Sequence, residues 1–204
     1  MATNFKRANP AALGLVGFGL TTVLLSLINA DVLPSSGDNV VIPLAIAYGG
    51  TIQIIAGLLE FSVGNTFGMT AFLSYGAFWL WYALMLIFGH SGVLPLKGDD
   101  ATIGVALLLW GVLTFYLWIG TFRINKALWL VFLTLWITYL LLGLGAILGL
   151  HDLTRAGGWV GIVCGAIAMY TSFAEVTNFC YGHQVVPTGH WGLHSGTAGE
   201  QPAE

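Results

Sequence analysis

Six long apolar stretches without a single Asp, Glu, Lys or Arg constrain this chain more than any other feature of its sequence. Its six basic and nine acidic residues all fall between these stretches or outside them. A membrane-spanning helix needs about 20 apolar residues to cross a hydrocarbon core about 30 Å thick. Stretches of this kind cover residues 8–30, 40–59, 67–89, 101–122, 127–150 and 156–174. The sequence therefore predicts an integral membrane protein.

The fold class follows from the bilayer itself. Backbone groups inside it must find hydrogen-bond partners within their own segment, and stretches rich in Leu, Ile, Ala and Phe do so as α-helices. We therefore expect an all-α integral membrane protein with six transmembrane helices per protomer. The short connections leave no room for a soluble domain. We expect a pore domain over residues 1–187 and a polar, disordered tail over residues 188–204.

Basic residues in the short connections predict the orientation. Cytoplasmic loops carry an excess of Lys and Arg. The side of the two termini holds Lys6, Arg7, Arg123 and Lys126, against Lys97 and Arg155 on the other side. We therefore expect both termini to be cytoplasmic, in a multi-pass protein of the cell inner membrane.

Small and polar residues share helix faces in four of the stretches. Small residues let membrane helices approach closely, so these faces can be packing seams. A face that alternates small and polar residues can equally line a passage, and both readings stay open. The faces are Gly14, Phe18, Thr21 and Leu25; Gly49, Gln53, Gly57 and Glu60; Gly68, Ala71, Tyr75 and Phe78; and Gly161, Gly165, Ala168, Ser172 and Glu175.

Two acids adjoin the stretches at their expected cytoplasmic ends. Glu60 and Glu175 are functional candidates because ionisable groups are costly there, although they can also reach the headgroups or cap a neighbouring helix. An anion passing through would meet neutral donors or helix N-terminal amides, since no stretch contains Lys or Arg. The candidate donors are Thr21, Thr22, Gln53, Asn65 and Tyr75, and Asn9-Pro10 suits the start of a helix that supplies such amides. Binding without a fixed positive charge is weak and passage fast, as in a channel or low-affinity carrier.

No motif in the sequence indicates an enzyme or a cofactor site. It contains no zinc-protease helix motif, phosphate-binding glycine loop or nucleophile elbow. The five histidines lie outside the middle of the stretches, which argues against haem, and those of the tail suit only weak metal binding. Tryptophans such as Trp79 and Trp118 are expected at membrane interfaces or subunit contacts. We expect no catalytic residue, no cofactor, no metal site and no nucleic-acid partner.

A faint internal repeat relates two of the stretches. Phe72-Leu73-Ser74-Tyr75 is similar to Phe132-Leu133-Thr134-Leu135. Such a match is expected if two three-helix halves are related, as in many transporters.

Several strings of the chain match a known family pattern. They are Asn9-Pro10-Ala11-Ala12-Leu13-Gly14-Leu15, Tyr48-Gly49-Gly50, Gln53, Ala56-Gly57-Leu58-Leu59-Glu60, Gly64-Asn65-Thr66-Phe67-Gly68, Thr70-Ala71-Phe72, Ser74-Tyr75-Gly76, Trp110-Gly111, Gly158-Trp159, Cys164-Gly165-Ala166 and Glu175. Over residues 8 to about 187 the chain resembles the acetate uptake transporter family, which includes bacterial succinate-acetate permeases. Ala12 departs from the pattern, because the family usually has a second proline there.

The resemblance implies particular roles for residues of this chain. Members are six-helix proteins that assemble as hexamers, with a pore for small carboxylates in each protomer. The family's constriction would fall on Phe18, Tyr75 and Leu135, and substrate size would depend on Ala168 and Leu135. Its polar pore residues would correspond to Asn9, Gln53, Glu60, Asn65 and Glu175.

The function expected from all this is membrane transport of small carboxylates, chiefly acetate, with succinate as a further substrate. The protein would be an anion channel, or a proton symporter if Glu60 or Glu175 carries a proton. Tyr75 and Gln53 would donate hydrogen bonds to the carboxylate. Its partners would be membrane lipid and further copies of itself. Two alternatives stay open: a non-transporting acetate sensor or scaffold, and a channel for a small neutral solute such as ammonia.

Overall fold

The computed structural model describes residues 8–93, 99–189 and 191 of the chain. Across these residues the only regular elements are helices. They are α1 (Ala11–Asn29), η1 (Ser35–Gly37), α2 (Asp38–Leu44), η2 (Ala45–Ile52), α3 (Gln53–Ser62), α4 (Thr66–His90), α5 (Asp100–Thr121), α6 (Lys126–Leu148) and α7 (His151–Tyr181). The segments from η1 to α3 form one crossing, Ser35–Ser62, so six helices are long and apolar enough to span a membrane. The predicted six-helix class is confirmed.

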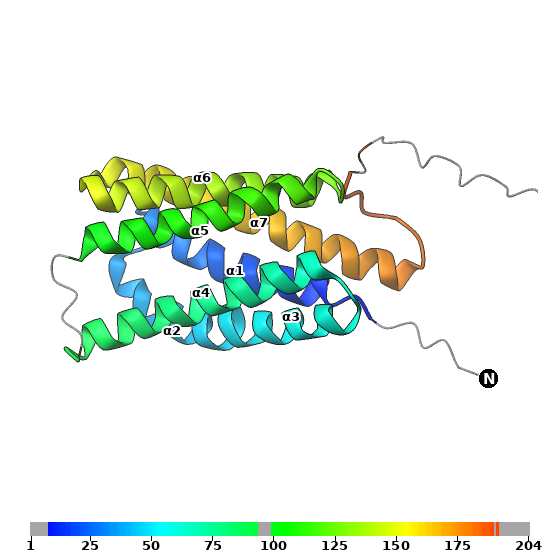
Figure 1. Ribbon diagram of the computed structural model, residues 1–204, viewed down its shortest axis with the longest axis horizontal. Helices are drawn as coiled ribbons and strands as arrows, with labels where there is room; N and C mark the ends of the chain where they lie inside the picture. The colour runs from blue at the N-terminus through cyan, green and yellow to red at the C-terminus, as the bar shows by residue number, and fades with distance from the viewer. Residues whose placement is uncertain (1–7, 94–98, 190, 192–204) are drawn as a thin grey trace, which may run out of the picture.

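The six crossings run side by side along the long axis of the molecule, and the described chain begins and finishes at the same end (Figure 1). We call this the terminal end and the opposite one the far end. Helices α1, α4 and α6 start at the terminal end, and each is followed by a crossing that returns to it. The main contacts join α1 to α7, α7 to α6, α6 to α5, and α3 to α4.

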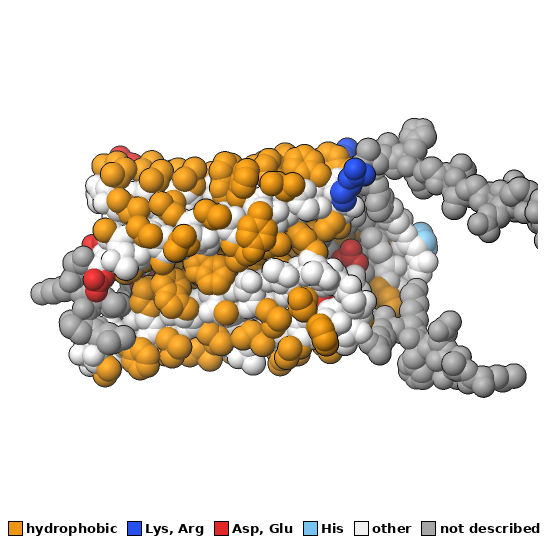
Figure 2. Space-filling model, in the orientation of Figure 1, with side chains coloured by type: hydrophobic (Ala, Val, Ile, Leu, Met, Phe, Trp, Pro, Cys, Tyr) orange, Lys and Arg blue, Asp and Glu red, His pale blue; other side chains and the backbone are white. Residues whose placement is uncertain are grey.

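On the face drawn in Figure 2, the charged side chains of the described residues gather toward the two ends of the bundle. Arg123 and Lys126 lie at the terminal end, where α5 passes into α6, and Asp31 and Asp152 lie at the far end. The sides between them carry exposed apolar side chains such as Phe61 and Leu109. This surface matches a bilayer, since lipid tails offer no hydrogen bonds to polar groups.

Glycines bring pairs of helices into close contact. A Cβ added at Gly19 of α1 would lie 2.7 Å from the carbonyl oxygen of Gly165 in α7, and one at Gly104 of α5 would lie 2.6 Å from that of Gly143 in α6. Even Gly161, on a face that could have lined a passage, packs against Ser26 of α1. The packing reading therefore holds for these glycines.

The second crossing changes its helical winding half-way. Pro43 lacks the N–H that an α-helix needs in its interior. The following segment η2 is a π-helix, in which the Thr51 hydroxyl donates to the carbonyl oxygen of Ile46 at 2.8 Å. Wide turns of this kind occur often at functional sites. Here the wide turn ends immediately before Gln53, whose side chain is fully buried.

Asparagines mark an internal repeat of three helix pairs. Asn9, Asn65 and Asn125 stand at the starts of α1, α4 and α6, the three helices that run away from the terminal end. The similar strings that begin at Phe72 and Phe132 are as far apart in sequence as Asn65 and Asn125, so they relate α4 to α6. The predicted relation of two three-helix halves would instead pair the third crossing with the sixth.

The chain turns back across the terminal end after α7. The carbonyl oxygens of Gly189 and Thr188 accept hydrogen bonds from the first two amides of α6, at 2.7 and 2.9 Å. The indole of Trp191 donates to the carbonyl oxygen of Thr121 and stacks on Phe122. These residues follow the domain boundary predicted at residue 187, and they satisfy amides that a helix start leaves unpaired. Residues 190 and 192–204 of the predicted tail lie outside the described part.

Candidate transport pathway

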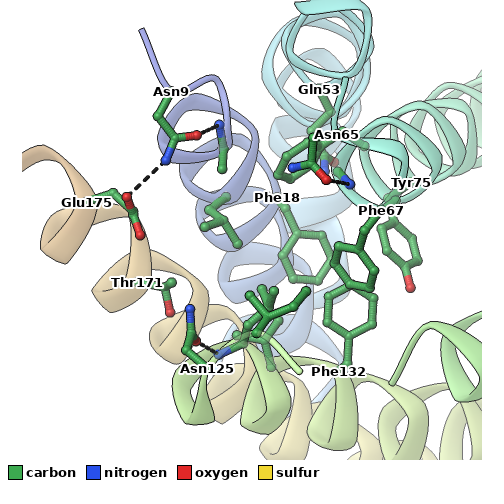
Figure 3. A pocket seen from close by; sticks show the side chains of 18 of the residues that line it. Asn9, Phe18, Gln53, Asn65, Phe67, Tyr75, Asn125, Phe132, Thr171 and Glu175 are labelled. Atoms are coloured by element: carbon green, nitrogen blue, oxygen red, sulfur yellow. Dashed lines mark hydrogen bonds between the residues drawn. The ribbon is translucent and has the colours of Figure 1, made fainter. Parts of the chain in front are cut away.

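A cavity of about 190 Å³ lies among the helices at the terminal end (Figure 3). We call it the terminal cavity. Helices α1, α4 and α6 supply most of its wall, which is apolar apart from a few side chains. The polar residues that line it are Asn9, Gln53, Asn65, Asn125, Thr171 and Glu175. A space of this kind offers a small solute an apolar surface with a few hydrogen-bonding groups.

A second cavity, of about 180 Å³, lies nearer the far end, and we call it the far cavity. Phe18 and Leu135 line both cavities and therefore stand between them. The ring of Tyr75 backs this partition, with its centroid 5.7 Å from that of Phe18. The three residues of the predicted constriction thus lie where two cavities meet. An apolar partition of this kind makes a solute shed water as it passes.

The hydroxyl of Tyr75 is already engaged. It lies 3.0 Å from the Thr114 hydroxyl on α5, and that hydroxyl donates to the carbonyl oxygen of Trp110 at 2.8 Å. Tyr75 is therefore the donor in its pair, and in Figure 3 its hydroxyl points away from Phe18. The structure thus gives this hydroxyl a partner other than the substrate carboxylate predicted for it, and what Tyr75 presents to the cavity is its ring.

The side-chain amide of Gln53 has no partner in the described part of the chain. The residue is 0 % exposed, and neither its Nε2 nor its Oε1 makes a hydrogen bond there. Leaving a buried polar group unpaired costs about 1–3 kcal/mol. Because Gln53 lines the terminal cavity, a molecule inside that cavity can satisfy this amide.

Both predicted acids pair with asparagines at helix starts. Asn65 donates to Glu60 at 2.9 Å and accepts from the amide of Gly68, so it caps α4. Asn9 donates to Glu175 at 3.0 Å and accepts from the amide of Ala11. Glu175 lines the terminal cavity, whereas Glu60 lines a more open hollow beside it that also includes Asn9 and Asn65. The two acids thus lie at the mouth of the cavity.

Three other predicted residues take different places. Thr21 is buried against Gly49 and donates to the carbonyl oxygen of Gly17, and it does not line either cavity. Ala168 is likewise buried away from both walls. Thr22 lines the far cavity, and its hydroxyl has no partner among the described residues.

Sequence reasoning missed some of the lining residues. Asn125 caps α6 by accepting from the amide of Leu128 at 2.8 Å, and it lines the terminal cavity. Its signal was the asparagine that also opens α1 and α4. Trp79, expected at a membrane interface, is buried and faces the far cavity, where its indole N–H lacks a partner in the described residues. Nothing in the sequence separates it from the other tryptophans.

Six crossings around two cavities and an apolar partition define the fold of a membrane channel or transporter. Residues 1–190 match the GPR1/FUN34/yaaH family, and the chain belongs to that family. This membership agrees with the resemblance seen in the sequence, and it identifies a family of transport proteins and not of enzymes.

Individual relatives extend over most of the chain. The succinate-acetate/proton symporter SatP of Escherichia coli (strain K12) is 43% identical over 186 residues, which cover 91% of this chain and 97% of that protein. Ammonia transport outward protein 2 of Saccharomyces cerevisiae is 40% identical over 175 residues, which cover 84% of this chain and 62% of that protein. A solved structure of the bacterial acetate channel SatP matches with a TM-score of 0.86 at 43% identity, over 90% of this chain and 100% of that one.

Proposed function

We propose that this protein conducts small carboxylates across the cell inner membrane, chiefly acetate and also succinate. The route runs through the terminal cavity, past Phe18 and Leu135, into the far cavity of the same protomer. The observation that carries the proposal is the unpartnered amide of Gln53 in the wall of a mostly apolar cavity. Its Nε2 can donate to a carboxylate, while the apolar wall accepts a methyl group.

The names of relatives support the same substrate class, because one is a succinate-acetate/proton symporter and another an acetate channel. A second candidate is the passage of ammonia, which one relative's name favours. A pathway without Lys or Arg in its wall also tolerates a neutral solute. Competition separates the two: unlabelled acetate suppresses uptake of labelled acetate if carboxylates use the route, and ammonium does so if ammonia shares it.

Changing Gln53 tests the proposal. We expect Gln53→Leu to lower the rate of labelled acetate uptake into proteoliposomes about tenfold, because a hydrogen bond to a charged group contributes about 1.5–3 kcal/mol. The thermal midpoint should stay equal or rise, since the variant removes an unpaired buried amide. Thr134→Val is the matched control, because this residue lines neither cavity and its hydroxyl donates to carbonyl oxygens of its own helix. Unchanged uptake by Gln53→Leu would mean that Gln53 serves helix packing and does not bind the substrate.

We further propose that Glu60, and not Glu175, carries a proton if transport is coupled to protons. Glu60 is 1 % exposed, and its Oε1 has no partner among described residues. Its hydrogen-bond partner is the neutral side-chain amide of Asn65 and not a basic side chain, which would stabilise the ionised carboxylate. We expect Glu60→Gln to abolish acetate accumulation driven by an inward proton gradient while downhill exchange continues. Glu175→Gln should keep both, and gradient-independent uptake by the unchanged protein would make it a channel.

Assembly and orientation are part of the same proposal. A homo-oligomer, expected to be a hexamer, would cover part of the apolar surface that includes Leu109, Val112 and Ile119 of α5. The basic residues Arg123 and Lys126 at the terminal end support a cytoplasmic position for both termini. Native mass spectrometry in detergent would give the number of protomers, and labelling of single cysteines from either side would give the orientation.

A further inference from the structure

The three asparagines at the terminal end differ in what their amide groups do. The Nδ2 of Asn65 donates one hydrogen bond to Glu60, and that of Asn9 donates one to Glu175. In both contacts the acid belongs to one helix pair and the asparagine begins another. The side-chain nitrogen of each of these two asparagines donates to a carboxylate.

The third asparagine, Asn125, has no such acid. Gly120 takes the place five residues before Asn125 that Glu60 takes before Asn65. The next residue, Thr121, ends α5, and its hydroxyl donates to the carbonyl oxygen of Trp118 at 2.6 Å. The Oδ1 of Asn125 accepts from the amide of Leu128, and its Nδ2 has no partner among the described residues. The third asparagine therefore keeps a free donor.

The surroundings of Asn125 hold this donor in place. The first two amides of α6 bind the carbonyl oxygens of Gly189 and Thr188, and the third binds the Asn125 side chain. The backbone at this helix start therefore has no free donor to offer an anion. The side-chain nitrogen of Asn125 is the donor that remains, and Figure 3 shows it pointing toward Thr171 at the cavity wall.

We propose that Asn125 Nδ2 binds the substrate carboxylate at the terminal mouth of the cavity, before the carboxylate reaches Gln53. The inference rests on the proposed function. Gln53 supplies independent support, because its fully buried and unpartnered amide lines the same cavity.

Asn125→Asp tests this inference without removing the helix cap, because aspartate caps helices as well as asparagine does. It replaces the free donor by an oxygen that repels a carboxylate. We expect acetate uptake into proteoliposomes to fall at least tenfold while the thermal midpoint stays within about 2 °C of the unchanged protein. Asn125→Ser also keeps a cap but adds no charge, and we expect its half-saturating acetate concentration to rise about threefold.

Asn39→Asp is the matched control, since it adds the same charge on an exposed side chain at the far end. Uptake by both Asn125 variants at the rate of the unchanged protein would overturn the inference and leave the proposed function intact. A lower thermal midpoint in both variants, in step with lost uptake, would overturn it too, because Asn125 would then serve the fold alone. Absence of acetate uptake by the unchanged protein would overturn the proposed function, and this inference with it.

Discussion

The two cavities have nearly equal volumes but different polar groups. The terminal cavity presents a carboxylate and several carboxamides, among them Glu175, Asn9 and Gln53. The far cavity presents mainly hydroxyls, an indole N–H and one carboxamide, with Thr22, Trp79 and Asn29 among its lining residues. Each contains buried groups without a partner in the described chain. Only the terminal cavity combines an acid with free amide donors, so selection for a carboxylate and any proton transfer should occur there.

Removing the apolar partition should join the two cavities into one path. We expect this change to have the largest effect on transport. Leu135→Ala takes away a side chain that both cavities share. Labelled lactate uptake should rise at least tenfold because the path widens. The free energy of unfolding should fall by about 2–3 kcal/mol, the low end for Leu→Ala, since the residue already borders empty space. Leu130→Ala, on an exposed part of α6, is the control, and unchanged lactate uptake by Leu135→Ala would place the size limit elsewhere.

A change in the far cavity should have a smaller effect. Trp79→Phe removes the free indole N–H but keeps an aromatic ring. We expect acetate uptake to fall about threefold, because a neutral hydrogen bond contributes about 0.5–1.5 kcal/mol. Uptake assays with the control Trp159→Phe, an exposed residue on α7, would show whether the far cavity binds substrate. A tenfold loss would make the two cavities equal partners and contradict the comparison.

The smallest effect on transport is expected from Tyr75→Phe. The ring that backs the partition stays, and only the hydroxyl bound to Thr114 is lost. Uptake should remain within about twofold, while the free energy of unfolding falls by about 1 kcal/mol because one buried hydrogen bond disappears. Chemical denaturation and uptake assays would separate the two effects. A large loss of uptake with unchanged stability would restore this hydroxyl as a substrate donor.

Hydrophobicity predicted the six crossings because a bilayer imposes its thickness on every span. Helical periodicity, in contrast, did not show which face of each helix lines a cavity. Thr21 and Phe18 lie one turn apart on the face predicted for α1, yet only Phe18 reaches a cavity. A helical face shows which residues point the same way, but not whether a neighbouring glycine such as Gly49 fills the space in front of them.

Other parts of the pathway depended on tertiary contacts that a sequence pattern does not contain. The π-helical turn before Gln53 places its amide inside the bundle, and Pro43 alone does not predict that turn. Asn125 lies between Arg123 and Lys126, and this pattern indicates a charged connection between two crossings. Its role as a cap became visible only beside its counterparts Asn9 and Asn65.

The segment that turns back after α7 has a consequence for how the protein is made. The amides at the start of α6 receive their partners from Thr188 and Gly189, which leave the ribosome only after every crossing has been synthesised. Until then the first two amides of α6 lack these partners, even in a bundle that has already inserted. Completion of this protein in the membrane is therefore a late event in translation, set by a few residues that never enter the bilayer.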